Sequence, residues 1–114
     1  MAHKGYTLNY FIDYFSSIPT NRWTEGALCE SGSNRLCALG HALAGPNPSE
    51  TRLNAIREGE FESNARTEAL QNFLDNRVED INDGSFGREL GVTPRGRILR
   101  ALRNRKRTGS VLGR

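Results

Sequence analysis

The sequence predicts a mainly α-helical protein, a compact bundle of four to five short helices with at most a minor strand pairing. Three observations predict this fold class. Apolar residues recur at helical spacing in several short segments, and Ser, Thr, Gly or Pro stand where these segments begin and end. The chain has 114 residues and 36% apolar residues, enough for one modest hydrophobic core.

The first helix is predicted after Thr7, a residue that favours the N-cap position, and Pro19 ends it. Four apolar residues at helical spacing form its buried stripe: Leu8, Phe11, Ile12 and Phe15. Tyr10 and Tyr14 lie off this stripe. They either line a neighbouring groove or widen the contact with the core, which is the more common outcome for such aromatic residues.

A second short helix is expected over residues 36–44, with Ser33 or Asn34 as its N-cap. One face of this helix carries Leu36, Leu39, Gly40 and Leu43. Gly40 allows a close approach of another backbone to that face. Cys37 and His41 lie together on a different face, so they do not simply extend the leucine stripe.

Ser49 is a good N-cap for a third helix with Leu53 and Ile56 facing inward. A fourth helix is expected within residues 64–76. Its apolar face consists of Ala65, Ala69, Leu70, Phe73 and Leu74. Residues 77–84 are read as a short strand or an extended link that ends in a turn of Asn82, Asp83 and Gly84.

The last helix is predicted from Thr93 as N-cap and Pro94 as the first helical residue. Its buried side is expected to contain Ile98, Leu99 and Leu102. Arg95 lies on the same side as Leu102 and is the arginine expected to face inward. The arginines expected to point outward are Arg97, Arg100, Arg103 and Arg107.

Charge divides the chain unequally. Residues 1–91 have a net charge of −5, whereas residues 92–114 contain seven Arg, one Lys and no acid. We expect one globular domain over residues 1–107 and a flexible basic tail over residues 108–114. The four outward arginines could neutralise phosphates of a nucleic acid, and the acidic body or the basic arm could dock on a host protein.

No apolar run is long enough to cross a bilayer and no secretory signal is seen, so a cytoplasmic protein without membrane contact is expected. Cys29 and Cys37 are too few for a disulfide framework. With His41 and His3 they also lack the paired spacing of a structural zinc site. The sequence therefore points to no metal and no cofactor.

Cys37 and His41 allow a catalytic interpretation. A thiol at a helix N-terminus beside a histidine can become a nucleophile, with Asn82 or Asp83 as a third group, which makes a Cys–His hydrolase one alternative. Adjacent positions on one helix direct the required hydrogen bond poorly, so a buried thiol beside a hydrogen-bonded imidazole is favoured. The protein is expected to be non-enzymatic.

A site for a small anionic ligand needs fewer assumptions. The helix start at Thr93 offers free backbone N–H groups, and Arg95 adds a guanidinium for phosphate. Asn82 and Asp83 can select polar edges of the ligand. The complete set of candidate ligand-binding residues is Arg95, Thr93, Asn82, Asp83, Trp23, Tyr14, His41 and Cys37. In this set Trp23 and Tyr14 stack on a base, although Trp23 in a polar loop more often pins that loop to the core.

Four segments in this order, "NYFIDYFSSIPTNRW", "LCALGHALAG", "INDG" and "TPRGRILRAL", resemble a group of small, largely uncharacterised proteins encoded by bacteriophages and their bacterial hosts. Members of that group have a Cys-Ala-Leu-Gly-His-like helix, an Asn-Asp turn and a last helix that begins with Thr-Pro. The resemblance implies a viral origin and, by analogy with small viral proteins, the binding or blocking of a host component.

These observations lead to one expected function. The chain is expected to be a phage protein that binds and sequesters a small phosphate-bearing, nucleotide-derived signalling molecule in the host cytoplasm and so counters host defence. The alternatives are the Cys–His hydrolase and a module that binds nucleic acid or a host protein through the basic helix. A homo-oligomer remains open.

Overall fold

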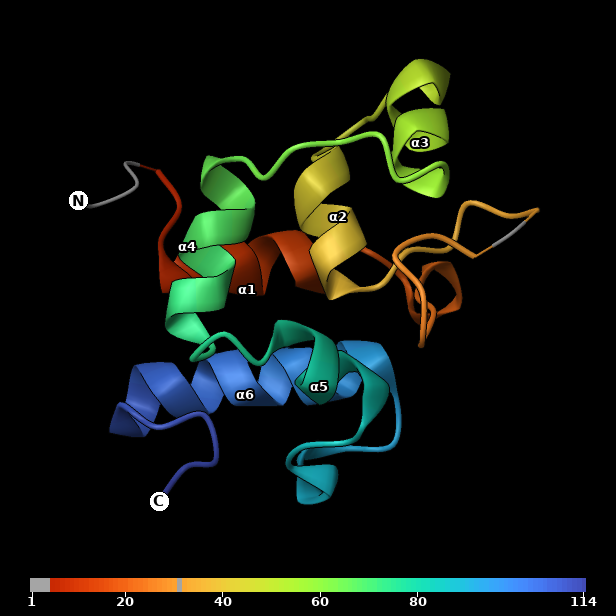
Figure 1. Ribbon diagram of the computed structural model, residues 1–114. Coiled ribbons are helices and arrows are strands. Elements are labelled where there is room, and N and C mark those ends of the chain that lie inside the picture. Colours follow the sequence, from red (N-terminus) through yellow and green to blue (C-terminus); the bar gives the residue numbers. More distant parts are fainter. Residues whose placement is uncertain (1–4, 31) are drawn as a thin grey trace.

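The computed structural model of the protein describes residues 5–30 and 32–114. This part of the chain forms six α-helices and two short 3-10 helices (Figure 1). The α-helices are α1 (Leu8–Ser16), α2 (Ala38–Ala44), α3 (Glu50–Arg57), α4 (Ala65–Phe73), α5 (Val78–Asp83) and α6 (Pro94–Thr108), and the 3-10 helices are η1 (Thr20–Arg22) and η2 (Arg88–Leu90). The predicted mainly helical bundle is confirmed, with six α-helices where the sequence suggested four or five.

Helix starts follow the local sequence closely. The N-caps predicted for α1, α3 and α6 are confirmed, because backbone N–H groups of the first turn donate to the hydroxyls of Thr7, Ser49 and Thr93. Helix α4 begins with a capping box, in which Asn64 and Thr67 each bond the backbone of the other. Side chains within four residues of a helix start therefore determine where these helices begin.

The start of α2 differs from the expectation. Its N-cap is Cys37, whose Sγ accepts a hydrogen bond of 3.4 Å from the N–H of Gly40. The prediction of Ser33 or Asn34 as the cap is wrong. Leu36 donates its backbone N–H to the carbonyl of Arg22, so the chain stays extended until Cys37.

Residues 77–84 form helix α5, and the prediction of a strand or extended link there is wrong. Val78 and Ile81 are three residues apart and both are fully buried, which is helical spacing. Gly84 ends the helix with a left-handed backbone, φ 80°. The described residues contain no β-strand, and two isolated bridges, of Trp23 and Cys29 with Leu36, are their only strand-like pairing.

Helix α6 packs along both α1 and α5, and α2 and α4 cover the other side of the core (Figure 1). The largest fully buried side chains of this core include Phe11, Phe15, Leu70, Leu74, Val78, Ile81, Ile98 and Leu102. The predicted burial of Ile98, Leu99 and Leu102 is confirmed. Trp23 belongs to the same core and pins its loop, with its ring 5.3 Å from that of Phe15.

Helix α3 lies at the edge of the molecule and packs on α2 (Figure 1). Leu53 and Ile56 face inward as predicted and join Leu43 in a second, smaller apolar cluster. The predicted close approach at Gly40 is also confirmed. A Cβ atom on Gly40 would lie only 2.2 Å from the carbonyl oxygen of Leu28, so this position excludes every other residue type without a shift of the backbone.

Flexibility is expected for residues 108–114; Thr108 is the last residue of α6, and residues 109–114 fold back on the end of that helix. Gly109 turns the chain with φ 82°, and Val111 becomes buried in the main core. The side-chain amide of Asn104 donates a 3.1 Å hydrogen bond to the carbonyl of Val111. Arg114 reaches Glu89 at 3.3 Å. These contacts attach the end of the chain to the domain.

Candidate functional site

The start of α6 carries an arginine that faces inward and is already engaged. Arg95 donates from Nε to the carbonyl of Ile18 at 2.9 Å and from a terminal nitrogen to the carbonyl of Ser16 at 2.8 Å. Ser16 is the last residue of α1, whose final carbonyls have no partner within the helix. Arg95 therefore acts as a C-terminal cap for α1, which removes two of its donors from ligand binding.

Asn82 is buried at the end of α5, with 0% of its surface exposed. Its Oδ1 accepts a 2.9 Å hydrogen bond from the backbone N–H of Ala38. Its Nδ2 donates to the carbonyl of Thr24 and to the carboxylate of Asp83. Asp83 in turn accepts from the N–H of Gly26 at 2.9 Å. These two side chains connect α5 to α2 and to the loop around Thr24, and they engage both polar atoms of Asn82 and the Oδ1 atom of the exposed Asp83.

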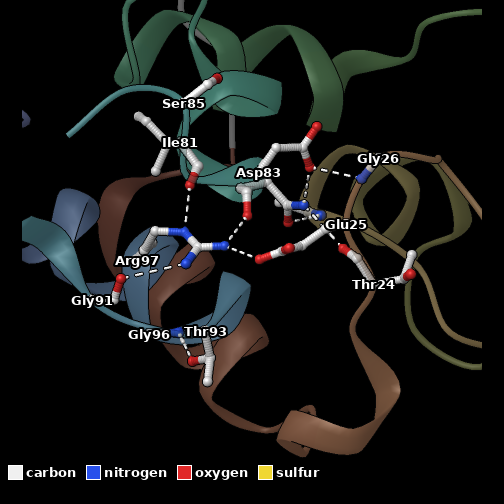
Figure 2. A network of polar contacts seen from close by, with 12 residues as sticks. Thr24, Glu25, Gly26, Ile81, Asp83, Ser85, Gly91, Thr93, Gly96 and Arg97 are labelled. Atoms are coloured by element: carbon white, nitrogen blue, oxygen red, sulfur yellow. Dashed lines mark hydrogen bonds and ion pairs between the residues drawn. The ribbon is translucent and has the colours of Figure 1, made fainter. Parts of the chain in front are cut away.

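Arg97 was expected to point outward, and that prediction is wrong. Its side chain is buried, and its guanidinium donates to the carbonyls of Ile81, Asn82 and Gly91 and pairs with the carboxylate of Glu25 (Figure 2). The reason is that α5 packs against this side of α6 and presents its last carbonyls there. The helical periodicity of residues 94–108 does not indicate that α5 packs against this side of α6.

Cys37 and His41 have the protonation states of packing residues. Burial raises the pKa of the Cys37 thiol from 9.0 to about 11, so the thiol is protonated at neutral pH. Burial also lowers the pKa of His41 from 6.5 to about 4, so its imidazole is neutral. Nucleophilic catalysis by cysteine requires the thiolate, which this environment disfavours.

The hydrogen bonds of this pair agree with that reading. The Nε2 atom of His41 lies 3.0 Å from the carbonyl oxygen of Arg22, and because a carbonyl only accepts, Nε2 carries the proton. The Sγ atom of Cys37 accepts from Gly40. The ring of Trp23 lies 4.9 Å from that of His41 and covers it. Both side chains therefore have structural partners of their own.

A cleft of about 580 Å³ opens where the end of α1 and η1 meet the end of α2 and the start of α3. Its polar lining includes Tyr14, Arg22, Asn34, His41 and Glu50, and its apolar lining includes Ile18, Pro19, Leu36 and Leu53. The hydroxyl of Tyr14 donates a 2.7 Å hydrogen bond to the carbonyl of His41. Burial, with a smaller effect of Tyr10, raises the pKa of Tyr14 to about 12, so the phenol is neutral.

Arg22 is the cation of this cleft, and it is not among the site residues predicted from the sequence. The residue is exposed, and within the described residues its guanidinium forms no hydrogen bond or ion pair. Its backbone carbonyl is held by Leu36 and His41, which fixes the position of η1 at the edge of the cleft. Its one sequence signal is its place next to Trp23, the buried anchor of the loop.

The candidate residues thus separate into different places. Tyr14 and His41 share the large cleft, and Trp23 packs behind His41. Cys37 and Asp83 line a different cavity of about 70 Å³. Thr93 and Arg95 line neither of these two cavities. The residues expected to form one site are thus divided, and the cleft contains two of them, Tyr14 and His41, together with Arg22.

Two further features bear on the chemistry of residues 5–30 and 32–114. No helix in these ranges has the length and apolar character to span a membrane. No three His, Cys, Asp or Glu side chains within them come together as metal ligands. Comparisons with protein-family models, with curated proteins and with solved structures give no match for this chain.

Proposed function

We propose that the protein binds a small phosphate-bearing, nucleotide-derived molecule in the cleft between α1, α2 and α3 and sequesters it unchanged. The observation that carries this proposal is the unpaired guanidinium of Arg22 at the edge of that cleft. A guanidinium binds phosphate through two parallel hydrogen bonds, and a free one beside a cleft favours an anionic ligand.

The size and lining of the cleft support a ligand of this class. Ligand sites usually have volumes of about 300 to 1,000 Å³ and combine apolar walls with a few polar groups. Here the volume is about 580 Å³, and Ile18, Pro19 and Pro46 supply apolar surface for a base. Tyr14 adds an aromatic ring that suits stacking.

Polar selectivity would come from neutral groups. The proton of Tyr14 is used by the His41 carbonyl, which leaves the lone pairs of its oxygen as acceptors. With its proton on Nε2, His41 has an acceptor at Nδ1. Glu50 is the one acid in the lining, so the phosphate is expected at the Arg22 side and a donor-rich sugar or base edge at the Glu50 side.

Sequestration without turnover follows from the state of Cys37 and His41. The Cys37 thiol is protonated, and its Sγ accepts a hydrogen bond from the N–H of Gly40, so it does not supply an activated nucleophile. The resemblance to phage-encoded proteins supports a biological role, in which removal of a nucleotide signal counters host defence. The cytoplasm of the host cell is where such a signal would be met.

Thermal unfolding of the full chain with a panel of linear and cyclic nucleotides tests this function. A ligand present at about 100 times its Kd adds about 2.7 kcal/mol to the free energy of unfolding and raises Tm by several degrees. We expect Arg22→Ala to abolish the shift. Arg52→Ala, which removes an exposed arginine of α3, is the matched control and should keep it. The bound molecule should be recovered intact after denaturation.

Two results would contradict the proposal. One is the absence of any shift across the panel. The other is a shift that Arg22→Ala leaves unchanged, because the ligand would then occupy another place on the molecule. Recovery of a hydrolysed product that depends on Cys37 would favour the hydrolase alternative.

A further inference from the structure

A second charged surface lies on α6, apart from the cleft. Arg100, Arg103 and Arg107 are exposed and follow one another at positions i, i+3 and i+7, so they form a single row along the helix. At 1.5 Å per residue the row is about 10 Å long. We call these three residues the arginine row.

The structure divides the basic residues of the C-terminal segment into engaged and free groups. Arg95 and Arg97 bind carbonyls of α1 and α5, Arg105 pairs with Asp75, and Arg114 pairs with Glu89. Lys106 donates to Asn9. Of the eight basic residues in 92–114, three therefore pair with carboxylates, namely Arg97, Arg105 and Arg114, whereas Arg95 and Lys106 donate to neutral groups.

The arginine row keeps its charge uncompensated. Arg100 and Arg103 form no hydrogen bond or ion pair with any residue that the structure describes. Arg107 donates to the side-chain oxygen of Asn104 at 2.9 Å, and that amide is neutral. Three guanidinium groups are therefore presented to solvent from one rigid, well-anchored helix.

We infer that the arginine row binds the phosphate backbone of a nucleic-acid duplex without reading its sequence. Charge complementarity identifies the partner, because a duplex places one negative charge per about 1.7 Å of its axis and so offers several phosphates along the row. Guanidinium groups match phosphate geometry. Arginine can contact guanine, but the row has no Asn or Gln to read adenine.

Other polyanions fit this surface less well. Single strands are held mainly by base stacking on aromatic rings, and the exposed face of α6 carries no aromatic residue. A membrane surface requires an apolar face beside the basic one. Within the described residues Val92 is the one large apolar side chain that is exposed, and a single valine does not form such a face.

Binding of fluorescent duplex DNA of mixed sequence to the full chain, followed by anisotropy, tests this inference. With three phosphates neutralised, the logarithm of the association constant should fall with the logarithm of salt concentration at a slope of about −2.7. The double variant Arg100→Gln, Arg103→Gln should bind roughly tenfold or more weakly at low salt and reduce the slope to about −0.9.

The matched control is Arg35→Gln with Arg52→Gln, which removes the same charge from two exposed arginines on other segments. This variant should retain duplex binding and its salt slope. Arg22→Ala should also retain both, so failure of the cleft proposal and failure of this inference are distinguishable. Equal loss in the control and the row variant would overturn the inference.

Competitors identify the class of partner. We expect single-stranded DNA, polyglutamate and phosphatidylcholine vesicles containing phosphatidylserine to compete more weakly than unlabelled duplex. If polyglutamate or the vesicles compete as well as duplex, the surface binds acidic proteins or membranes instead and the inference is overturned. If single strands bind more tightly than duplex, the assignment to a duplex is likewise overturned.

Discussion

Asn82 Oδ1 accepts a 2.9 Å hydrogen bond from the backbone N–H of Ala38, a residue 44 positions away in the chain. Ala38 is the first residue of α2, where backbone N–H groups lack partners within the helix. The same side chain donates to the carbonyl of Thr24. One buried amide thus connects α5, α2 and the loop that contains Trp23.

Asn82→Ala should destabilise the protein by about 3 kcal/mol, because it leaves the Ala38 N–H and the Thr24 carbonyl without partners in the interior. Urea unfolding followed by circular dichroism measures this change. Asn72→Ala is the control, since Asn72 is exposed on α4, and it should change stability by less than about 0.5 kcal/mol. Equal effects of the two substitutions would show that Asn82 is not a structural connector.

Arg97→Lys should lower the free energy of unfolding by about 2 kcal/mol. A lysine ammonium cannot reach the carbonyls of Ile81, Asn82 and Gly91 together as the planar guanidinium does. The control is Arg103→Lys on the exposed side of α6, with an expected change below about 0.5 kcal/mol. Chemical denaturation of both variants makes the comparison, and an unchanged midpoint for Arg97→Lys would contradict the buried position.

His41 should make the protein less stable as the pH falls. Its folded pKa of about 4 lies below the ordinary 6.5, so unfolding takes up a proton. The stability is complete above about pH 6.5 and is lost as the pH falls toward 4. Between pH 7 and pH 5 the loss from this group is about 2 kcal/mol.

The variant His41→Gln keeps a donor for the Arg22 carbonyl and removes this titration. Denaturant unfolding at several pH values should therefore show a smaller decrease for the variant than for the native chain. His3 is present in both proteins, so the difference isolates His41. Parallel pH profiles would mean that His41 titrates normally in the folded state.

The Cys37 thiol should react slowly in the folded protein. In a Cys29→Ser variant Cys37 is the one thiol of the chain, and a pKa of about 11 instead of 9.0 reduces the thiolate fraction at pH 8 by about a hundredfold. Maleimide labelling followed by mass spectrometry should be about a hundred times faster in urea than in buffer. Rapid labelling of the folded variant would instead revive the Cys–His hydrolase alternative.

The residues of the cleft could be predicted from the sequence only in part. Tyr14 and His41 were candidate residues, but Arg22 was not, because its role depends on contacts between segments. The carbonyl of Arg22 is bound by Leu36 and His41, which lie 14 and 19 positions further along the chain. Local sequence patterns therefore do not show that Arg22 is an unpaired cation at a cleft, because the two residues that hold its backbone are distant in the sequence.

The sequence by itself determined the helices that begin with strong caps and carry an apolar stripe. Thr7, Ser49 and Thr93 act within three residues of their own position, and the burial of Phe11, Phe15 and Leu102 follows from a spacing of three or four residues. These interactions are local, so they are encoded in short stretches and can be recognised there.

Only the tertiary structure decided which polar side chains are free. Arg97 and Arg100 lie one turn apart on α6, yet one is buried against the carbonyls of α5 and the other is exposed. The distribution of charged residues along the sequence does not distinguish Arg97 from Arg100. Whether a guanidinium binds its own protein or a partner depends on the unpaired carbonyls that packing brings near it. Because these carbonyls are distant in the sequence, a local sequence pattern does not predict the contact.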